Sequence, residues 1–478
     1  MMKNKLHILL LPLLLLMPAA CNDFLQQEPI SDLTAESFWQ TPTDAEVGVQ
    51  AIYNAFSLAM SSGLWDWGEL RADNFIPHEK DAWDQAELIN NTIQTDNQAA
   101  SWTQLFSVIA RANDAIRYIP NISITPATKN NLLAEAHAMR AWAYFYCVRV
   151  WGDLPLYTEP VKDIADGIYR TRTDQNKILQ EVVLSDLERA YYLIAKTYPE
   201  GTATPHTRMN PATICALMMD VNAWMHNYEA VVKIKEEKAD ALSRNRWGLV
   251  ALTPATFQAD WRNIFFRHPD SETPIEVLFK IAYDKDGNGE NQQVNYFASS
   301  QPRVYLSDAA KGIYTDVSDK RFGATQWEDI GSNRSQLNRK FWQNNTIFGD
   351  KPGRDYSDNS LVLYRYADIV LLYAEALNEI DRTADAIREL NRTRERAGAP
   401  AFKASDFTDK REVLDAILKE RQKEFLGEGK RWFDLLRTNR WKETMQPING
   451  MNDPRQVLFP IHRDHLNQNY NLVQNEGY

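Results

Sequence analysis

A dense group of ionisable side chains lies between positions 420 and 437. It includes Glu420, Arg421, Glu424, Glu428, Arg431, Asp434 and Arg437. As a catalytic set they would offer paired carboxylates for general acid–base work, such as glycoside hydrolysis. However, opposite charges stand three residues apart in Arg421–Glu424, Glu428–Arg431 and Asp434–Arg437, which is the spacing of ion pairs on a helix surface. We therefore interpret the group as a structural ion network between helices.

Aromatic residues within polar stretches are a second source of chemistry. The segment 61–97 combines Gly63, Gly68 and Pro77 with three tryptophans, which predicts a long, functional loop. An exposed indole can stack on the apolar face of a sugar ring, while amide, carboxylate and guanidinium groups reach its hydroxyls. The candidate ligand-binding residues of this segment are Trp65, Trp67, Arg71, Asp73, Asn74 and Trp83. The alternative for any one tryptophan is that it pins a loop to the body of the protein.

The N-terminal segment predicts export and a lipid anchor. Lys3 and Lys5 precede an uncharged run over 6–20, which is typical of a signal peptide and too short for a membrane-spanning helix. The run ends in Ala19-Ala20-Cys21, the lipobox arrangement in which the cysteine is acylated, although Pro18 stands where leucine is usual. We expect Cys21 to carry acyl chains such as palmitate that hold the protein on a membrane. An ordinary secreted start is the alternative.

Metal-binding patterns are weak. Asp284, Asp286 and Asn288 match the first half of a calcium loop, but Asn295 stands where the bidentate glutamate belongs. A glycine-rich turn is the simpler interpretation, with weak calcium binding left open. The histidines lack neighbours at metal-site spacing, and phosphate-loop and nucleophile-elbow motifs are absent from the sequence. We therefore expect neither a cofactor nor a metal.

Composition limits the class of protein. The 478 residues carry a net charge of −11 and a mean hydropathy of −0.48. An acidic body argues against nucleic acid as a partner, because such proteins need a basic footprint. Cys147 and Cys215 follow the lipid-site cysteine, and we expect buried thiols there, with a disulfide as the alternative.

Hydrophobic periodicity predicts a mostly helical chain. Helices are expected over 45–60, 99–119, 129–150, 174–196, 210–226, 228–244, 363–379, 383–397 and 409–437, and a strand over 275–281. Residues 245–360 are otherwise rich in loops. Paired helices joined by short turns favour a helical solenoid of tetratricopeptide-like pairs, although the sequence shows no clean 34-residue period.

Three separated stretches resemble the SusD/RagB family of outer-membrane lipoproteins of starch-utilisation-type systems. The first holds Cys21-Asn22-Asp23-Phe24-Leu25, Phe38-Trp39 and Ala51-Ile52-Tyr53-Asn54; the second runs from Arg140-Ala141-Trp142 to Trp151-Gly152-Asp153-Leu154-Pro155; the third includes Arg365-Tyr366-Ala367-Asp368, Arg394-Glu395-Arg396-Ala397-Gly398, Arg431-Trp432-Phe433-Asp434-Leu435 and Asn475-Glu476-Gly477-Tyr478. These motifs follow the family's order over essentially the whole chain after the signal peptide.

The resemblance implies a fold and a function. Members are mostly α, with four tetratricopeptide-like helix pairs forming a platform beneath a loop-rich, minor-β part that binds ligand. They capture oligosaccharides, or peptides in some branches, and act as a lid over a SusC-like TonB-dependent transporter barrel in the outer membrane. They are not enzymes. By region, further ligand contacts are expected from Tyr296, Trp327 and Trp342, whereas Trp142, Trp151 and Trp432 lie in core motifs.

We therefore divide the chain into a signal peptide (1–20), a lipidated tether (21–43), an N-terminal helical region (44–244) with a binding loop (61–97), and a C-terminal region (245–478) with variable loops (245–360) and helices (363–437). The expected protein is a non-enzymatic, glycan-binding lipoprotein facing the cell exterior. Peptide or other nutrient binding on the same scaffold is the first alternative, and an all-helical glycoside hydrolase is the second.

Overall fold

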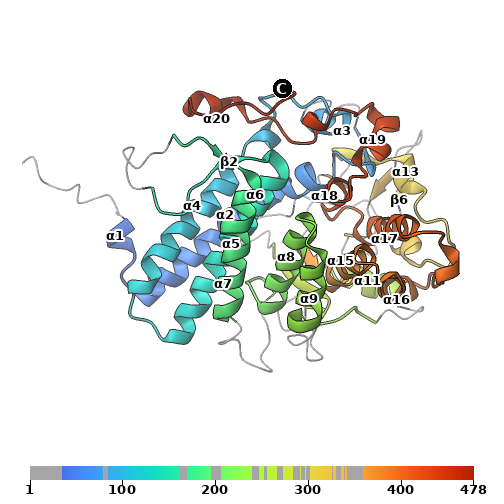
Figure 1. The fold of residues 1–478 in the computed structure, drawn as a ribbon, viewed down its shortest axis with the longest axis horizontal. Helices are drawn as coiled ribbons and strands as arrows, with labels where there is room; N and C mark the ends of the chain where they lie inside the picture. The colour runs from blue at the N-terminus through green and yellow to red at the C-terminus, as the bar shows by residue number, and fades with distance from the viewer. Residues whose placement is uncertain are drawn as a thin grey trace, which may run out of the picture.

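The computed structural model of the protein is mostly helical, with a few short strands (Figure 1). It describes residues 35–78, 84–161, 169–194, 206–239, 247–251, 256–265, 273–283, 291, 296–297, 302–325, 327–329, 335–337, 340–341 and 359–478. The signal peptide, Cys21 and most of the tether lie outside these ranges. Everything below concerns the described residues.

The N-terminal part is built from long helices with well-defined starts. Its helices are α1 (Ala35–Phe38), α2 (Pro42–Gly68), α3 (Asp84–Asn90), α4 (Thr103–Tyr118), α5 (Pro126–Trp151), α6 (Gln175–Ile178), α7 (Ser185–Ile194), α8 (Pro211–Trp224) and α9 (Tyr228–Ile234), with 3-10 turns η1 (Gln98–Ala100) and η2 (Ile119–Asn121) and π-helical segments η4 (Leu179–Leu184) and η5 (Lys235–Ala239). A capping box of Thr41 and Asp44 starts α2. Thr125 and Asn210 cap α5 and α8, each followed by a proline in the first turn. Local sequence therefore sets where these helices begin.

The C-terminal part is also mainly helical. It contains α11 (Phe257–Asn263), α13 (Asp308–Lys311), α14 (Arg321–Thr325), α15 (Tyr366–Glu379), α16 (Thr383–Arg396), α17 (Lys410–Phe425), α18 (Arg431–Arg437), α19 (Trp441–Asn449) and α20 (Arg463–Gln468), with 3-10 turns η8 (Ala404–Asp406) and η9 (Pro454–Gln456). In the described parts of both halves, helices that neighbour each other in sequence pack together: α4 on α5, α8 on α9 and α15 on α16. This confirms the predicted tetratricopeptide-like helix pairs.

The described strands form two-stranded antiparallel sheets only. They pair as β1 (Phe75–Pro77) with β5 (Val304–Leu306), β2 (Leu154–Pro155) with β3 (Arg172–Thr173), β4 (Val277–Ile281) with β8 (Leu361–Arg365), and β6 (Trp327–Asp329) with β7 (Ser335–Leu337). The predicted strand over 275–281 is confirmed as β4. All five of its residues are buried. The β1–β5 and β4–β8 pairs therefore join segments that are distant in the sequence, and the described strands form no separate layer.

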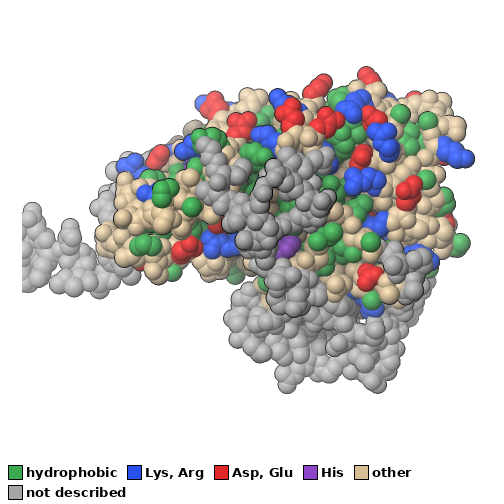
Figure 2. All heavy atoms as spheres, turned by 90° about the horizontal axis from the view of Figure 1, so that it is seen from below, with side chains coloured by type: hydrophobic (Ala, Val, Ile, Leu, Met, Phe, Trp, Pro, Cys, Tyr) green, Lys and Arg blue, Asp and Glu red, His purple; other side chains and the backbone are tan. Residues whose placement is uncertain are grey.

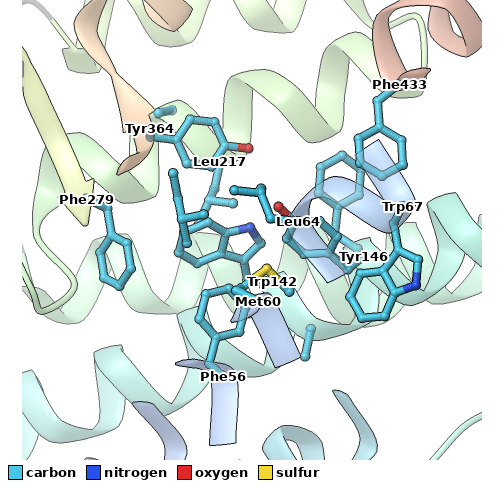
Figure 3. Packing of buried hydrophobic residues seen from close by; sticks show 14 of the residues in the cluster. Phe56, Met60, Leu64, Trp67, Trp142, Tyr146, Leu217, Phe279, Tyr364 and Phe433 are labelled. Carbon is cyan, nitrogen blue, oxygen red and sulfur yellow. The ribbon is translucent and has the colours of Figure 1, made fainter. Parts of the chain in front are cut away.

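An aromatic cluster forms the middle of the core (Figure 3). The ring of Trp142, on α5, lies 4.7 Å from Phe56 of α2, 5.1 Å from Phe279 of β4 and 5.5 Å from Tyr364 of β8. Trp142 is thus a packing residue, as its motif implied. Because β4 and β8 belong to the C-terminal part, this cluster joins the two parts of the chain into one core.

The structure corrects three predicted element boundaries. Helix α2 continues to Gly68, so residues 61–68 are helix rather than loop. Residues 363–365 belong to strand β8, and α15 starts only at Tyr366. The long helix expected over 409–437 is broken between α17 and α18, where Gly427 and Gly429 have φ angles of +78° and +72° that other residues rarely adopt.

The charged group of the C-terminal helices forms a buried network, which confirms its structural interpretation. Arg365 contacts Glu276 at 2.5 Å, Glu424 at 2.9 Å and Glu428 at 2.9 Å, and Arg321 contacts Glu424 at 2.9 Å. Each of these side chains is at most 2% exposed. The network therefore joins the residue before β4, the end of β8, α14 and the end of α17 in the interior of the protein.

Of the three ion pairs expected from a spacing of three residues, the Asp434–Arg437 pair is present. Arg437 does pair with Asp434, at 2.8 Å, and also with Glu375 of α15 at 2.8 Å. Arg421, in contrast, reaches Asp434 across the break between α17 and α18, at 2.8 Å. Arg431 pairs with Asp73 at 2.8 Å. Most of these charges therefore join separate elements rather than successive turns of one helix.

Two further expectations can be compared with the described residues. Cys147 and Cys215 are buried free thiols, so the disulfide alternative is excluded. In the described segments, each helix is too short or too polar to cross a bilayer. On the face shown in Figure 2, acidic and basic side chains are intermixed, with hydrophobic side chains between them.

Candidate functional site

The end of α2 is held against the turn between α17 and α18. A Cβ atom on Gly68 would lie 1.9 Å from the carbonyl oxygen of Gly429, so only glycine permits this approach. The Glu69 carboxylate then accepts hydrogen bonds from the backbone N–H groups of Gly427 at 3.2 Å and of Gly429 at 2.9 Å. Burial raises the pKa of Glu69 to about 7. The start of the expected binding segment is thus fixed to the C-terminal helices.

Trp65 and Trp67 lie inside the protein, which corrects the expectation of exposed rings in a loop. Trp65 is fully buried, its Nε1 donates to the carbonyl of Gly427 at 3.0 Å, and its ring lies 4.8 Å from that of Tyr296. Trp67 is 4% exposed and donates to the carbonyl of Ala99 at 2.8 Å. Figure 3 shows Trp67 beside Tyr146 within the aromatic cluster. Neither ring offers a free face to a ligand.

Arg71 is also buried and serves the packing of the C-terminal segment. Its Nη1 donates to the carbonyl of Val457 at 2.7 Å, and its guanidinium lies 4.7 Å from the ring of Trp432. Burial lowers the pKa of Arg71 to about 10. The side chain therefore stabilises a junction between distant segments, and its surroundings leave no surface for a ligand.

Asp73 and Asn74 join the same interior. Asp73 forms the ion pair with Arg431, and Asn74 donates to Glu69 at 2.6 Å. The amide of Gln422 donates to Asn74 at 2.8 Å. At 7% and 0% exposed, these two side chains are buried among protein partners, and their contact with a ligand stays a prediction.

The structure does bring the two expected binding segments together. Strand β1 lies within the segment 61–97 and strand β5 within the variable loops 245–360, and they pair with Phe75 opposite Leu306 and Pro77 opposite Val304. Tyr296, which is fully buried, donates its hydroxyl to Asp66 of α2 at 2.7 Å. The segment 61–97 and the variable loops 245–360 therefore share a packed base, which is formed by β1, β5, Trp65 and Tyr296. Tyr296 is a buried part of this base and is not an exposed contact for a ligand.

Asp66 is a buried acid within this base. Burial raises the pKa of Asp66 to about 6, against the opposing effects of the Tyr296 hydrogen bond and of the positive charge of Arg303. The guanidinium of Arg303 lies 5.0 Å from the Tyr296 ring. Sequence reasoning missed both Asp66 and Arg303. A carboxylate between two tryptophans, as in Trp65-Asp66-Trp67, was the available signal for a buried acid.

The remaining candidates lie wholly or partly outside the described residues. Trp83, Trp342, Asp284, Asp286 and Asn288 are not among them, and for Trp327 the structure describes only the backbone, in strand β6. Their expected roles stay predictions. Among the described residues, no group of three or more histidine, cysteine or acidic side chains could hold a metal ion.

Family models match both halves of the chain. One, described as the SusD family, matches residues 258–478, and a second, described as starch-binding and associating with the outer membrane, matches residues 23–219. A SusD-like protein of Formosa agariphila is 30% identical over 96% of both chains. A SusD-like protein of Bacteroides ovatus is 24% identical over 91% of this chain and 82% of its own.

Solved structures share the fold. A SusD homolog from Bacteroides thetaiotaomicron superposes with a TM-score of 0.74 at 24% identity, covering 92% of this chain and 99% of its own. A laminarin-binding SusD-like protein gives 0.75 at 20% identity, covering 92% and 100%. A surface glycan-binding protein of B. thetaiotaomicron, in complex with laminarihexaose, gives 0.72 at 18% identity, covering 91% and 100%. At these identities the likeness establishes the fold alone.

Proposed function

The chain belongs to the SusD family, and from this membership we propose that it is a cell-surface protein that captures oligosaccharides and delivers them to a partner TonB-dependent transporter of the SusC type. It binds its ligand without cleaving it. The observation that carries the proposal is the pair of family matches, which together take in both halves of the chain. Two relatives of the same fold are named for binding laminarin or a laminarin hexasaccharide.

The geometry of the described residues supports a binding role. The β1–β5 pairing and the Trp65–Tyr296 contact give the two variable segments a rigid common base. A rigid base reduces the entropy that binding loops lose when they close on a ligand. The carboxylates that could have suggested a hydrolase, such as Glu424 and Glu428, are instead neutralised by Arg365 inside the ion network.

Native electrophoresis through gels that contain laminarin, starch or xylan tests the proposal. We expect retarded migration in at least one gel and no new reducing ends after incubation. Replacing Trp83 by alanine should weaken retention about tenfold, because an indole is a strong stacking partner for a sugar face. Tyr192→Ala on α7, where the tyrosine is 53% exposed, is the control and should migrate as the unmodified protein does.

Each other result identifies a different function. Release of reducing sugar would favour the glycoside hydrolase. Retention of peptides alone, with free migration in every polysaccharide gel, would favour the peptide-binding alternative. Normal retention of the Trp83→Ala protein would contradict the assignment of Trp83 while leaving glycan binding intact.

We further propose that acylated Cys21 anchors the protein in the outer membrane, with residues 22–43 as its tether. The lipobox spacing and the family description that mentions the outer membrane support this proposal. An alkyne fatty acid fed to cells should label the intact protein and not the Cys21→Ala variant. The variant should leave the membrane fraction, because it lacks acyl chains that each contribute about 0.8 kcal/mol per buried methylene. Unlabelled protein that still sediments with membranes would contradict the anchor.

A further inference from the structure

An open pocket of about 700 Å³ lies where α4 starts, beside β2 and α20. Its volume falls within the range of small-molecule binding sites. In Figure 1, α20 and β2 lie at the upper left of the molecule, whereas α3, α13 and β6, which border the expected binding segments, lie at the upper right. α20 begins beside the end of the 61–97 segment, where the N–H of Arg463 donates to the carbonyl of Thr95 at 2.8 Å. The described lining residues of the pocket nevertheless include none of the predicted ligand contacts, so the pocket is distinct from those contacts.

Fixed aromatic rings form the inner wall of this pocket. The ring of Phe106 lies 5.4 Å from Trp102 and 6.2 Å from Tyr157. Trp102 is stacked on His465 of α20, with ring centroids 4.8 Å apart and an interplanar angle of 12°. The backbone N–H of Tyr157 donates to the Tyr144 hydroxyl at 2.8 Å. These contacts hold the wall in place before any ligand arrives.

One exposed tyrosine lines the pocket, and a second packs beside it. Tyr169 is 40% exposed and lines the pocket, and its ring lies 5.6 Å from that of Tyr470, which is 80% exposed. Asn471 donates to the carbonyl of Tyr169 at 2.5 Å, and Asn469 donates to the carbonyl of Arg170 at 2.9 Å, so the two rim segments are tied together. An ordered pair of exposed aromatic rings presents an apolar face that water leaves readily.

The described polar side chains that line the pocket are neutral. Thr103, Asn467 and Gln468 are exposed at its edge. Burial lowers the pKa of His465 to about 4, with His462 as a further cause, so the imidazole is uncharged at neutral pH. The described lining residues include no lysine, arginine, aspartate or glutamate. These described residues suit a ligand that has hydroxyl groups and an apolar face. The guanidinium of Arg170 lies 4.6 Å from the ring of Tyr157 and donates to the carbonyl of Leu156, so it already has partners within the protein.

We propose that this pocket is a second glycan-binding site, in which a neutral oligosaccharide stacks on the Tyr169–Tyr470 pair and hydrogen-bonds to Asn467 and Gln468. The ligand class is shared with the proposed function, and the proposal rests on it to that extent. When a polysaccharide is bound at one site, its effective concentration at the other site is high. Chains long enough to reach both sites are therefore bound more tightly than short ones.

The double variant Tyr169→Ala/Tyr470→Ala tests the proposal in the full-length protein, with Tyr192→Ala as the matched control. Whichever of laminarin, starch and xylan retards the unmodified protein is the probe, and its hexasaccharide is used for calorimetry. We expect two hexasaccharides per chain for the unmodified protein and one for the double variant, with polysaccharide retention weakened about tenfold. Both tyrosines are at the surface, and an unchanged unfolding midpoint verifies that the variant is folded.

A second variant, Asn467→Ala/Gln468→Ala, removes the amides and keeps the rings. It should also weaken the second hexasaccharide about fivefold, roughly the effect of losing one hydrogen bond. Two results would show that the pocket is not a glycan site while the proposed function stands. The first is that both double variants still bind two hexasaccharides. The second is that the unmodified protein binds a single hexasaccharide, which Trp83→Ala abolishes and the two double variants do not. If the unmodified protein binds no glycan, both proposals fail. Normal glycan binding with lost co-purification of the transporter would make the pocket a protein interface and overturn the proposal.

Discussion

Replacing Arg365 by methionine is expected to lower the free energy of unfolding by about 3–5 kcal/mol, because it removes a cation that three buried carboxylates share and leaves each of them with less compensating charge. Arg365 is fully buried and neutralises Glu276, Glu424 and Glu428. Methionine keeps much of the side-chain volume, so the loss reports charge rather than a cavity. Urea denaturation followed by circular dichroism gives the midpoint and slope that measure it.

Arg388→Met is the matched control for this prediction. Arg388 also pairs with a carboxylate, Asp385 at 2.6 Å, but its side chain is 69% exposed. Exposed pairs contribute roughly 0–1 kcal/mol, so this variant should unfold close to the unmodified protein. Equal midpoints for Arg365→Met and Arg388→Met would show that the buried network does not hold β8 to α17.

The same network predicts how stability depends on pH. Burial alone would raise the pKa of Glu424, but Arg396, Arg365 and Arg321 outweigh burial and hold that pKa well below its usual value. The folded pKa is thus below the unfolded one, so the network's contribution is present above the unfolded pKa of roughly 4.3 and is lost as the pH falls below it. Arg365→Met should flatten this acid-side loss.

The ion network shows what spacing in a sequence can and cannot predict. The density of charges correctly indicated a structural role, because catalytic carboxylates do not need so many arginines beside them. The partners could not be found the same way. Glu424 lies 59 positions from Arg365 in the chain, and their contact follows only from the packing of β8 against the end of α17. Asp434–Arg437, whose residues share one helix, was the pair that local spacing could identify.

Gly63 and Gly68 explain why the binding loop was predicted to start too early. Glycines within a helical pattern usually signal a break. Here they signal close approach: a Cβ atom on Gly63 would lie 2.4 Å from the ring of Trp67, and one on Gly68 would meet the backbone of Gly429. Both glycines let α2 continue in a crowded place. The periodic helices elsewhere, such as α5 and α16, were predictable to within a few residues because their apolar residues keep the spacing of a buried helix face.

Replacing Trp65 by alanine is expected to lower the free energy of unfolding by about 3–5 kcal/mol, the cost of removing a large buried aromatic side chain. Trp65 is fully buried against Tyr296 and Phe297. Its loss opens a cavity under the base that joins the two binding segments, and it leaves the carbonyl of Gly427 without the indole donor. Urea denaturation of the variant measures this cost.

Trp65→Phe separates packing from hydrogen bonding at the same position. Phenylalanine keeps a ring against Tyr296 but has no N–H for Gly427, so we expect a loss of about 1–3 kcal/mol, smaller than that of alanine. Retention in polysaccharide gels should remain measurable for Trp65→Phe, because a fully buried ring contacts no ligand directly. A Trp65→Ala protein with an unchanged unfolding midpoint and no glycan retention would instead return Trp65 to the ligand surface, and would require the end of α2 to open when glycan binds.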